Sequence, residues 1–126
     1  MSRQTVAVWG EAEAQRFLEG HGWTVVAKNW HCRYGEIDLI AREGEMVVFV
    51  EVKTRRQRSF GLPEEAMTPS KRRRLLRSAS TYLEENSLQE VDWRIDVVAI
   101  EGRPGRAPAR LDHYRDALEA DQDTYR

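Results

Sequence analysis

The first regular pattern of hydrophobic residues lies near the N-terminus. In the stretch GEAEAQRFLEGHGW, Ala14, Phe17 and Leu18 recur at the spacing of one helix face. Gly20 and Gly22 follow directly, and glycine is the residue that most often ends a helix. The pattern predicts a helix over residues 6–20.

A second helical pattern lies in the middle of the chain, in the stretch TPSKRRRLLRSASTYLEEN. Thr68 suits an N-cap, and Pro69 suits the first helical position, where a backbone N–H would have no helical partner. The apolar residues of the stretch fall on one stripe: Leu75, Leu76, Ala79, Tyr82 and Leu83. This stripe predicts an amphipathic helix over residues 69–85.

Short runs rich in β-branched and aromatic residues predict strands over 23–28, 35–41, 46–53 and 93–100. The stretch EGRPGRAP predicts a loop, because two prolines and two glycines interrupt any strand pairing. After about residue 111 we expect a short edge strand at most, followed by a polar acidic tail over 116–126. The order α-β-β-β-α-β predicts one α/β domain over residues 1–115 with a mixed central sheet.

Charged residues interrupt two of these strands, in the stretch GEIDLIAREGEMVVFVEVK. Charges among apolar neighbours are costly unless they are paired or bind a metal. Because side chains alternate across a strand, we expect Glu36, Asp38 and Ile40 on one face. Ile37 and Leu39 are expected on the opposite face.

The turn between these strands decides which charges meet. A turn made of Glu43 and Gly44 would place Asp38 opposite Phe49, and opposed residues project from the same face of a sheet. The charged side chains expected on that face are Glu36, Asp38, Glu51 and Lys53. A turn of three residues would shift the register by one and separate them.

Asp38 and Glu51 are diagonal neighbours in this arrangement, with Cα atoms about 7–8 Å apart. Two carboxylates this close repel each other, so we expect either Lys53 or a divalent cation beside them. Oxygen ligands suit Mg²⁺ or Mn²⁺, with water and substrate phosphate completing the coordination. A solvated ladder of Glu and Lys side chains on an exposed hairpin would have the same spacing and stays open as an alternative.

Composition limits the class of protein. A chain of 126 residues can bury a core without disulfides, and its single cysteine, Cys32, has no intramolecular partner. No basic-then-apolar leader opens the sequence, and no apolar run approaches the about 20 residues that cross a bilayer. We therefore expect a cytoplasmic protein without membrane contact. The three histidines lack metal-binding spacing to each other or to Cys32, which argues against a zinc site.

The net charge of −1 conceals a separation of charge along the chain. Residues 53–77 carry nine Lys and Arg against two Glu, whereas residues 111–126 carry five acids against two Arg. A basic surface beside the carboxylates is where a phosphate backbone would lie, although a solvated helix face would have the same composition.

These residues together resemble a known family. An acid after a strand turn, followed by the Glu-Val-Lys of residues 51–53, resembles the PD-(D/E)XK signature of restriction-endonuclease-like nucleases. The stretches GEAEAQRFLEGHGW, NWHCRYGEIDLIAREGEMVVFVEVKTRR, TPSKRRRLLRSASTYL and RIDVVAI resemble, in this order, the uncharacterised bacterial YraN-type family over about residues 10–100. That family is similar to archaeal Holliday junction resolvases. The resemblance implies a restriction-endonuclease-like core with helices flanking the sheet.

The resemblance also implies roles for individual residues. Asp38 resembles the first metal-binding acid, although it follows Ile37 rather than the proline of the superfamily name. Glu51 resembles the second metal ligand, and Lys53 resembles the catalytic lysine. Glu11 resembles the helical glutamate that many resolvase-like members add to the site, whereas the pattern alone indicates a solvated helix charge.

A set of basic residues is expected at the nucleic acid: Arg55, Arg56, Lys71, Arg72, Arg73 and Arg74. Lys71 also matches a recurring basic position of the family at the start of a helix, where it would touch phosphate. Glu36 is expected in a supporting role beside the acids.

The expected function is a Mg²⁺- or Mn²⁺-dependent endonuclease that hydrolyses phosphodiester bonds in DNA, with branched, Holliday-junction-like DNA among its substrates. Lys53 would orient the attacking water and stabilise developing charge. By analogy with resolvase-like enzymes we expect a homodimer. Two alternatives stay open: a nucleic-acid-binding module that uses the same surface without cutting, and an interaction domain that self-associates through its separated charges.

Overall fold

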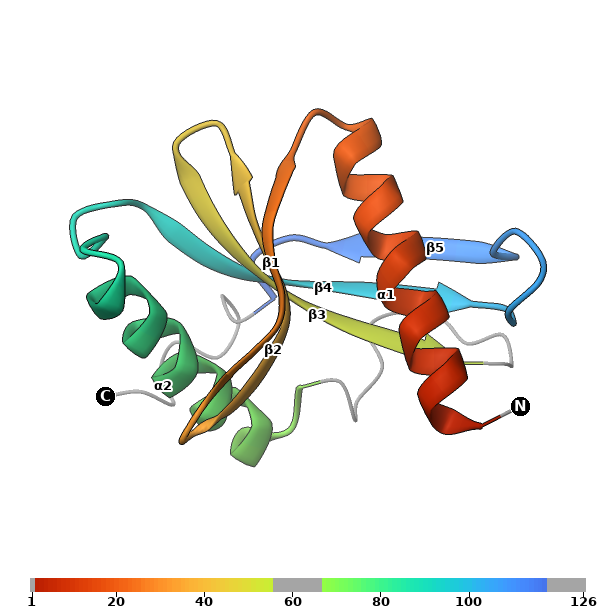
Figure 1. Ribbon diagram of the computed structural model, residues 1–126, viewed down its shortest axis with the longest axis horizontal. Coiled ribbons are helices and arrows are strands. Elements are labelled where there is room, and N and C mark those ends of the chain that lie inside the picture. The colour runs from red at the N-terminus through yellow and green to blue at the C-terminus, as the bar shows by residue number, and fades with distance from the viewer. Residues whose placement is uncertain (1, 56–66, 118–126) are drawn as a thin grey trace.

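The structure is a computed structural model that describes residues 2–55 and 67–117. Within these ranges the chain forms helices and strands in the order α-β-β-β-α-β-β (Figure 1). The elements are α1 (Arg3–Gly20), β1 (Thr24–Cys32), β2 (Gly35–Glu43), β3 (Met46–Arg55), α2 (Pro69–Glu85), β4 (Trp93–Glu101) and β5 (Arg110–Tyr114). The predicted order is confirmed, and β5 lies where a short edge strand was expected.

The strands form one five-stranded sheet in the order β1-β2-β3-β4-β5. The β3–β4 pair is parallel and the other neighbouring pairs are antiparallel, so the sheet is mixed as predicted. Parallel neighbours need a long crossover connection, and α2 provides it between β3 and β4. The arrangement is consistent with a restriction-endonuclease-like core.

Buried hydrophobic residues form two clusters, because α1 and α2 cover opposite faces of the sheet. Val47 and Phe49 of β3 pack in the cluster that includes Leu75, Ala79 and Leu83 of α2. The alternate β3 residues, Val48 and Val50, pack in the cluster that includes Ala14 and Leu18 of α1. The two-residue period of β3 therefore separates the core into an α1 side and an α2 side.

Side-chain caps define the starts of both helices. The Thr68 hydroxyl accepts a hydrogen bond from the backbone N–H of Lys71 at 3.2 Å, and Pro69 opens α2 as predicted. The Ser2 hydroxyl accepts a hydrogen bond from the backbone N–H of Thr5 at 3.1 Å, so α1 begins at Arg3 rather than at residue 6. The first turn of α1 is polar, which is why the hydrophobic pattern did not reveal it.

α1 approaches β3 very closely at Gly10. Gly10 is buried, and a Cβ atom placed on it would collide with the Cγ2 methyl group of Thr54. Glycine is therefore required here by the packing of helix against sheet. The close approach places the next residue of α1, Glu11, near enough to Asp38 of β2 for their charges to interact.

The β2–β3 turn differs from the prediction by one residue in each strand. It consists of Gly44 and Glu45, and Glu43 pairs with Met46. Of the two turn residues only Gly44 has a positive φ, 61°, which is the arrangement of a type II′ turn with glycine in the first position. The predicted turn at Glu43 and Gly44 placed glycine second and is wrong.

This correction changes the expected alignment of Asp38 with Glu51 across the two strands. The observed register, continued past its last pair at Leu39 and Val50, puts Asp38 opposite Glu51 instead of Phe49. The predicted turn and the observed turn each have two residues, so the pairing of β2 with β3 shifts by two residues. Each β3 side chain therefore stays on its predicted face of the sheet. Asp38 and Glu51 are thus the first residues beyond the last β2–β3 pair, and their side chains interact with each other.

The regular alternation of side chains between the two faces of the sheet is broken in β2 at Asp38. Ile37 packs on the α2 side of the sheet and Leu39 on the α1 side, although residues two apart in a strand normally share a face. The β1–β2 register places Asn29 opposite Asp38, and Asn29 has a φ of 49°, so both strands are distorted at this point. The prediction that Ile37 and Leu39 share one face is therefore wrong.

A buried ion cluster fixes β5 to the rest of the sheet. Asp96 is 0% exposed and accepts hydrogen bonds from Arg94 Nε at 2.8 Å, from His113 Nε2 at 2.8 Å and from the Asp116 backbone N–H at 2.9 Å. Burial opposes the charged form, but these hydrogen bonds outweigh it and lower the pKa of Asp96. Arg94 also binds Glu43 at 2.9 Å, which ties the β2–β3 hairpin to the same cluster.

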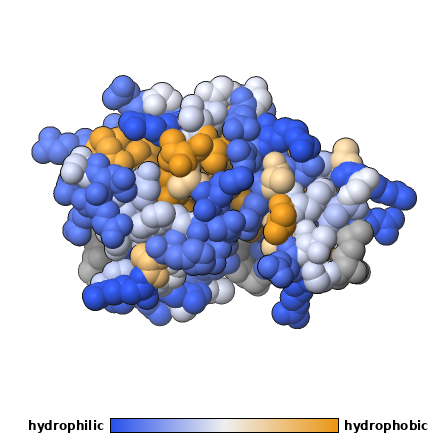
Figure 2. All heavy atoms as spheres, in the orientation of Figure 1, coloured by the Kyte–Doolittle hydropathy of each residue, from blue (hydrophilic) through white to orange (hydrophobic). Residues whose placement is uncertain are grey.

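The face of the molecule seen in Figure 2 is mostly hydrophilic, with a patch of hydrophobic residues at the upper left.

In the part of the chain that the structure describes, no helix combines the length and apolarity needed to cross a membrane. Arg56 and the polar tail from residue 118 onward lie outside the described residues.

Candidate active site

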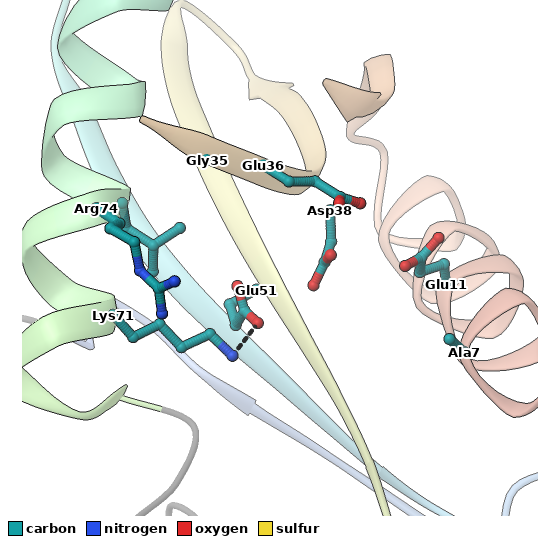
Figure 3. Close-up of a pocket in the computed structure, with 9 residues that line it drawn as sticks. Ala7, Glu11, Gly35, Glu36, Asp38, Glu51, Lys71 and Arg74 are labelled. Atoms are coloured by element: carbon teal, nitrogen blue, oxygen red, sulfur yellow. Dashed lines mark ion pairs between the residues drawn. The ribbon is translucent and has the colours of Figure 1, made fainter. Parts of the chain in front are cut away.

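A pocket of about 370 Å³ opens where β2 parts from β3, and both helices contribute to its walls. Its lining residues are Ala7 and Glu11 of α1, Gly35, Glu36 and Asp38 of β2, Glu51 of β3, and Lys71, Arg74 and Leu75 of α2. Figure 3 shows Asp38 and Glu51 in the centre, Lys71 and Arg74 on the α2 side, and Glu11 on the α1 side. The pocket therefore gathers acidic groups from three elements and basic groups from a fourth.

Asp38 takes the place of a backbone partner for β3. Backbone pairing between β2 and β3 ends at Leu39 and Val50. Beyond that pair, Asp38 Oδ2 accepts a hydrogen bond from the backbone N–H of Val52 at 2.8 Å. This bond fixes the Asp38 carboxylate beside β3 at the point where the strands separate.

Glu51 is the most buried acid of the pocket, with only 6% of its surface exposed. Its carboxylate forms an ion pair with Lys71, whose Nζ lies 2.6 Å from Glu51 Oε1 (Figure 3). Burial and the nearby negative charge of Asp38 nevertheless raise the pKa of Glu51 to about 7. One lysine is therefore not enough to offset desolvation and repulsion at this position.

The pKa values of two other acids of the pocket, Asp38 and Glu11, are also raised. Burial, together with the charge of Glu36, raises the pKa of Asp38 despite the hydrogen bond from Val52. Burial, followed by the charge of Asp38, raises the pKa of Glu11, which the side chain of Asn29 lowers in part. Glu11 is thus electrostatically part of the site rather than a solvated helix charge.

The donor set of the pocket fits Mg²⁺ or Mn²⁺. Among residues 2–55 and 67–117, no three or more His, Cys, Asp or Glu side chains are grouped closely enough to hold a metal ion by themselves. Mg²⁺, however, commonly binds through one or two carboxylates, with water and substrate phosphate as the other ligands. Asp38 and Glu51 provide two such carboxylates, and a divalent cation between them would relieve their mutual repulsion.

Lys53 lies on β3 two residues after Glu51, outside the residues that line the pocket. Its positive charge is close enough to lower the pKa of Glu51, though less than Lys71 does. Its catalytic role stays a prediction.

The basic residues that were expected to contact nucleic acid differ in their exposure. Arg73 and Arg74 are exposed on α2, and Arg74 lines the pocket together with Lys71. Arg72 is 9% exposed and donates a hydrogen bond to the backbone carbonyl of Met67 at 3.2 Å. We therefore remove Arg72 from the proposed surface, because its guanidinium stabilises the start of α2 from inside. Arg55 is partly buried at the end of β3.

A second basic feature lies beside the pocket and was missed in the sequence. The guanidinium of Arg33 lies 4.8 Å from the centre of the Tyr34 ring, and that of Arg77 lies 5.7 Å from it. Tyr34 and Arg77 line a further pocket along α2, one turn beyond Arg74. The charge run of α2 hinted at Arg77, but only the fold brings the β1–β2 turn against it.

Comparisons with known proteins agree with the resemblance over the same region. A model of the uncharacterised protein family UPF0102 matches residues 10–100. A UPF0102 protein of Geotalea daltonii (strain DSM 22248 / JCM 15807 / FRC-32) is 41% identical over 116 residues, which cover 92% of this chain and 91% of that protein. A UPF0102 protein of Nocardia farcinica (strain IFM 10152) is 46% identical over 113 residues, which cover 90% and 88%.

A third relative, UPF0102 protein NMC2069 of Neisseria meningitidis serogroup C, is 50% identical over 93 residues, which cover 74% of this chain and 81% of that protein. The matched residues 10–100 extend from Gly10, where α1 lies close to β3, to Ile100, one residue before the end of β4. They include all the acids and Lys71 of the pocket. By sequence, the chain belongs to the uncharacterised protein family UPF0102.

Proposed function

We propose that this protein is a Mg²⁺- or Mn²⁺-dependent endonuclease that hydrolyses phosphodiester bonds in DNA, including branched DNA. One observation supports the proposal above the others. Two partly or fully buried carboxylates, Asp38 and Glu51, face each other in a pocket whose opposite wall carries the basic residues Lys71 and Arg74. A pocket with acids at its floor and cations at its rim suits a metal ion and a phosphate at once.

Each acid has a distinct part in this proposal. Asp38 and Glu51 would hold the metal, which when bound supplies Lewis-acid stabilisation of the phosphate and a more acidic water. Glu11 faces them from α1 and would accept hydrogen bonds from metal-bound or attacking water. Lys53 would stabilise charge that develops on the phosphate.

The basic side chains would position the DNA. Arg74 and Lys71 lie at the pocket, and Arg33 and Arg77 continue the positive surface across Tyr34. Contacts of this kind bind the phosphate backbone without reading its sequence. A symmetric homodimer belongs to the same proposal, since it would present two such surfaces to a four-way junction.

The test combines metal binding with cleavage. Calorimetric titration of Mn²⁺ into the wild type should show binding that Asp38→Ala abolishes. The wild type should also cleave at least one of linear, flapped and four-way DNA in Mn²⁺, and Asp38→Ala should not. Circular dichroism would first establish that Asp38→Ala is folded. Failure of the wild type to cut any of these substrates would reject the nuclease.

A nucleic-acid-binding module without catalysis is the second candidate, and the spread of basic residues beyond the acids favours it. Arg33 and Arg77 are not among the residues that line the acidic pocket, and they would bind DNA without contacting the metal ion. This candidate predicts salt-dependent DNA binding that survives Glu51→Ala, with no cleavage by the wild type, because counterion release depends on Lys and Arg alone.

A further inference from the structure

We propose that Lys71 is the resident counterion of the site: it occupies the cation position beside Glu51, and a divalent metal ion must displace it to bind. This inference deepens the proposed function, on which it rests. It assigns Lys71 a positioning role that differs from a simple contact with phosphate, and it predicts that the chain itself weakens metal binding.

The distance between Lys71 and Glu51 and the burial of Glu51 support this inference. Lys71 Nζ lies 2.6 Å from Glu51 Oε1, which is the distance of a charge-assisted hydrogen bond. The Glu51 side chain is 8% exposed, so few other directions are open to a ligand that approaches its carboxylate. An ammonium group in that position occupies part of the space that a metal ion would need. It would also repel the ion at close range.

The two partners differ in their freedom to move. Glu51 lies in the middle of the sheet, where its backbone pairs with Val97 of β4. Lys71 lies in the first turn of α2, on a flexible stem of four carbons, and its side chain is 28% exposed. The Thr68 cap holds the Lys71 backbone while leaving the side chain free to rotate. The ion pair can therefore open by movement of the lysine alone, without any change in the strands.

The displaced ammonium group of Lys71 would have a new partner in a DNA phosphate. Arg74 lies one helical turn after Lys71 and lines the same pocket, so the rim of the site is already positive. A DNA phosphate at this rim would accept a hydrogen bond from the released ammonium group. Metal ion and phosphate would then replace one intramolecular ion pair with two intermolecular ones, and each ligand would favour the binding of the other.

The experiment measures metal binding in the absence of DNA, by calorimetric titration of Mn²⁺ into the full chain. Lys71→Gln removes the charge and keeps a polar side chain. If Lys71 is the resident counterion, Lys71→Gln should bind Mn²⁺ more tightly than the wild type, on the order of tenfold, because one unit charge at ion-pair distance is removed. Lys71→Arg retains the charge and should bind Mn²⁺ as weakly as the wild type does.

Arg73→Gln is the matched control, because it removes one positive charge from an exposed position of the same helix. It should leave Mn²⁺ affinity within about twofold of the wild type, since an exposed charge is screened by solvent and salt. An equal gain in Arg73→Gln and Lys71→Gln would show a general charge effect and would overturn the inference.

The outcomes separate the inference from the proposed function. Wild-type binding that Lys71→Gln leaves unchanged or weakens would overturn the counterion role and leave the nuclease proposal standing. Binding by Lys71→Gln but not by the wild type would support the counterion role in its strongest form. Absence of binding in both proteins, each folded by circular dichroism, would overturn the metal site itself and with it both proposals.

Discussion

At the scale of single residues, Glu51 has an environment far from that of an ordinary surface carboxylate. Burial and the charge of Asp38 raise its pKa from 4.5 to about 7, even though Lys71 forms an ion pair with it. A carboxylate whose charged form is so unfavourable in the folded protein is typical of a ligand-binding site rather than of a stabilising interaction. The cost itself can be measured through the pH dependence of folding.

We expect the free energy of unfolding of the metal-free wild type to fall as pH rises from about 4.5 to about 7. In this window the folded state retains a proton on Glu51 that the unfolded state releases, so higher pH favours unfolding. Glu51→Gln cannot ionise and should show a shallower decline, because only Asp38 and Glu11 then contribute to it, which gives the variant a relative gain of about 1–3 kcal/mol at alkaline pH. Urea unfolding in the presence of a chelator, at about pH 5 and about pH 8, measures the difference. Parallel pH profiles for the two proteins would contradict the raised pKa.

Adjacent arginines of α2 should behave in opposite ways, because one is inside the protein and the other outside. Arg72 donates a hydrogen bond to the Met67 carbonyl from a position 9% exposed, so Arg72→Ala should lower the free energy of unfolding by about 1–3 kcal/mol. Arg73 is exposed, so Arg73→Ala should change it by less than about 0.5 kcal/mol. Urea unfolding of both variants checks the contrast. Equal stability would return Arg72 to the nucleic-acid surface.

At the scale of elements, the position of α1 over β3 depends on the absence of one side chain. A Cβ atom on Gly10 would collide with the Thr54 methyl group, and a β-branched side chain has little freedom to turn away. The same contact places Glu11 over Asp38, so the packing of the helix and the composition of the site are linked.

Gly10→Ala should therefore be destabilising by about 1–3 kcal/mol before a helix-propensity gain of about 1 kcal/mol is subtracted. Gly20→Ala is the control, because no atom lies within 4 Å of a Cβ added at the end of the same helix. It should be neutral or slightly stabilising. Thr54→Ser removes the colliding methyl group, so adding it to Gly10→Ala should restore stability. Thermal unfolding compares the variants, and an unimpaired Gly10→Ala would refute the close packing.

At the scale of the whole molecule, the near-zero net charge is compatible with a positive surface on one side. Exposed basic residues of α2 lie beside the pocket, whereas the β4–β5 loop lies at the other end of the molecule (Figure 1). The local field at α2, rather than the net charge of −1, should govern association with DNA.

Arg74→Ala should weaken DNA binding and reduce the slope of log affinity against log salt by about 1, as expected for one lost phosphate contact. Arg106 is exposed in the loop before β5, so Arg106→Ala removes the same charge away from α2. It should leave the slope unchanged. Fluorescence anisotropy with labelled DNA over a series of salt concentrations provides both slopes. Identical slopes for all three proteins would place the DNA elsewhere.

The elements were predictable because their signals are local. The Thr68–Pro69 start of α2 depends on one hydrogen bond within its first turn, and the valines of β3 alternate along a single strand. The start of α1 and the end of β1 at Cys32 were not predicted, because polar residues there give no periodic signal.

The site was predictable only in part. The sequence identified Asp38, Glu51 and, through the resemblance, Glu11, and the structure brings all three into one pocket. It did not identify the ion pair between Lys71 and Glu51, because residues on separate elements carry no mark of their contact. It also placed the carboxylates diagonally, since it put Gly44 second in the turn rather than first.

Sequence alone determined which residue types are available and in what order the helices and strands occur, because caps, turns and alternation act over a few neighbouring positions. Tertiary structure decided which charge lies beside which: β2 parts from β3 at Asp38, α1 comes close at Gly10, and α2 brings Lys71 to Glu51. The physical reason is that burial and Coulomb energies depend on distances through space. Those distances are fixed only when the layers pack.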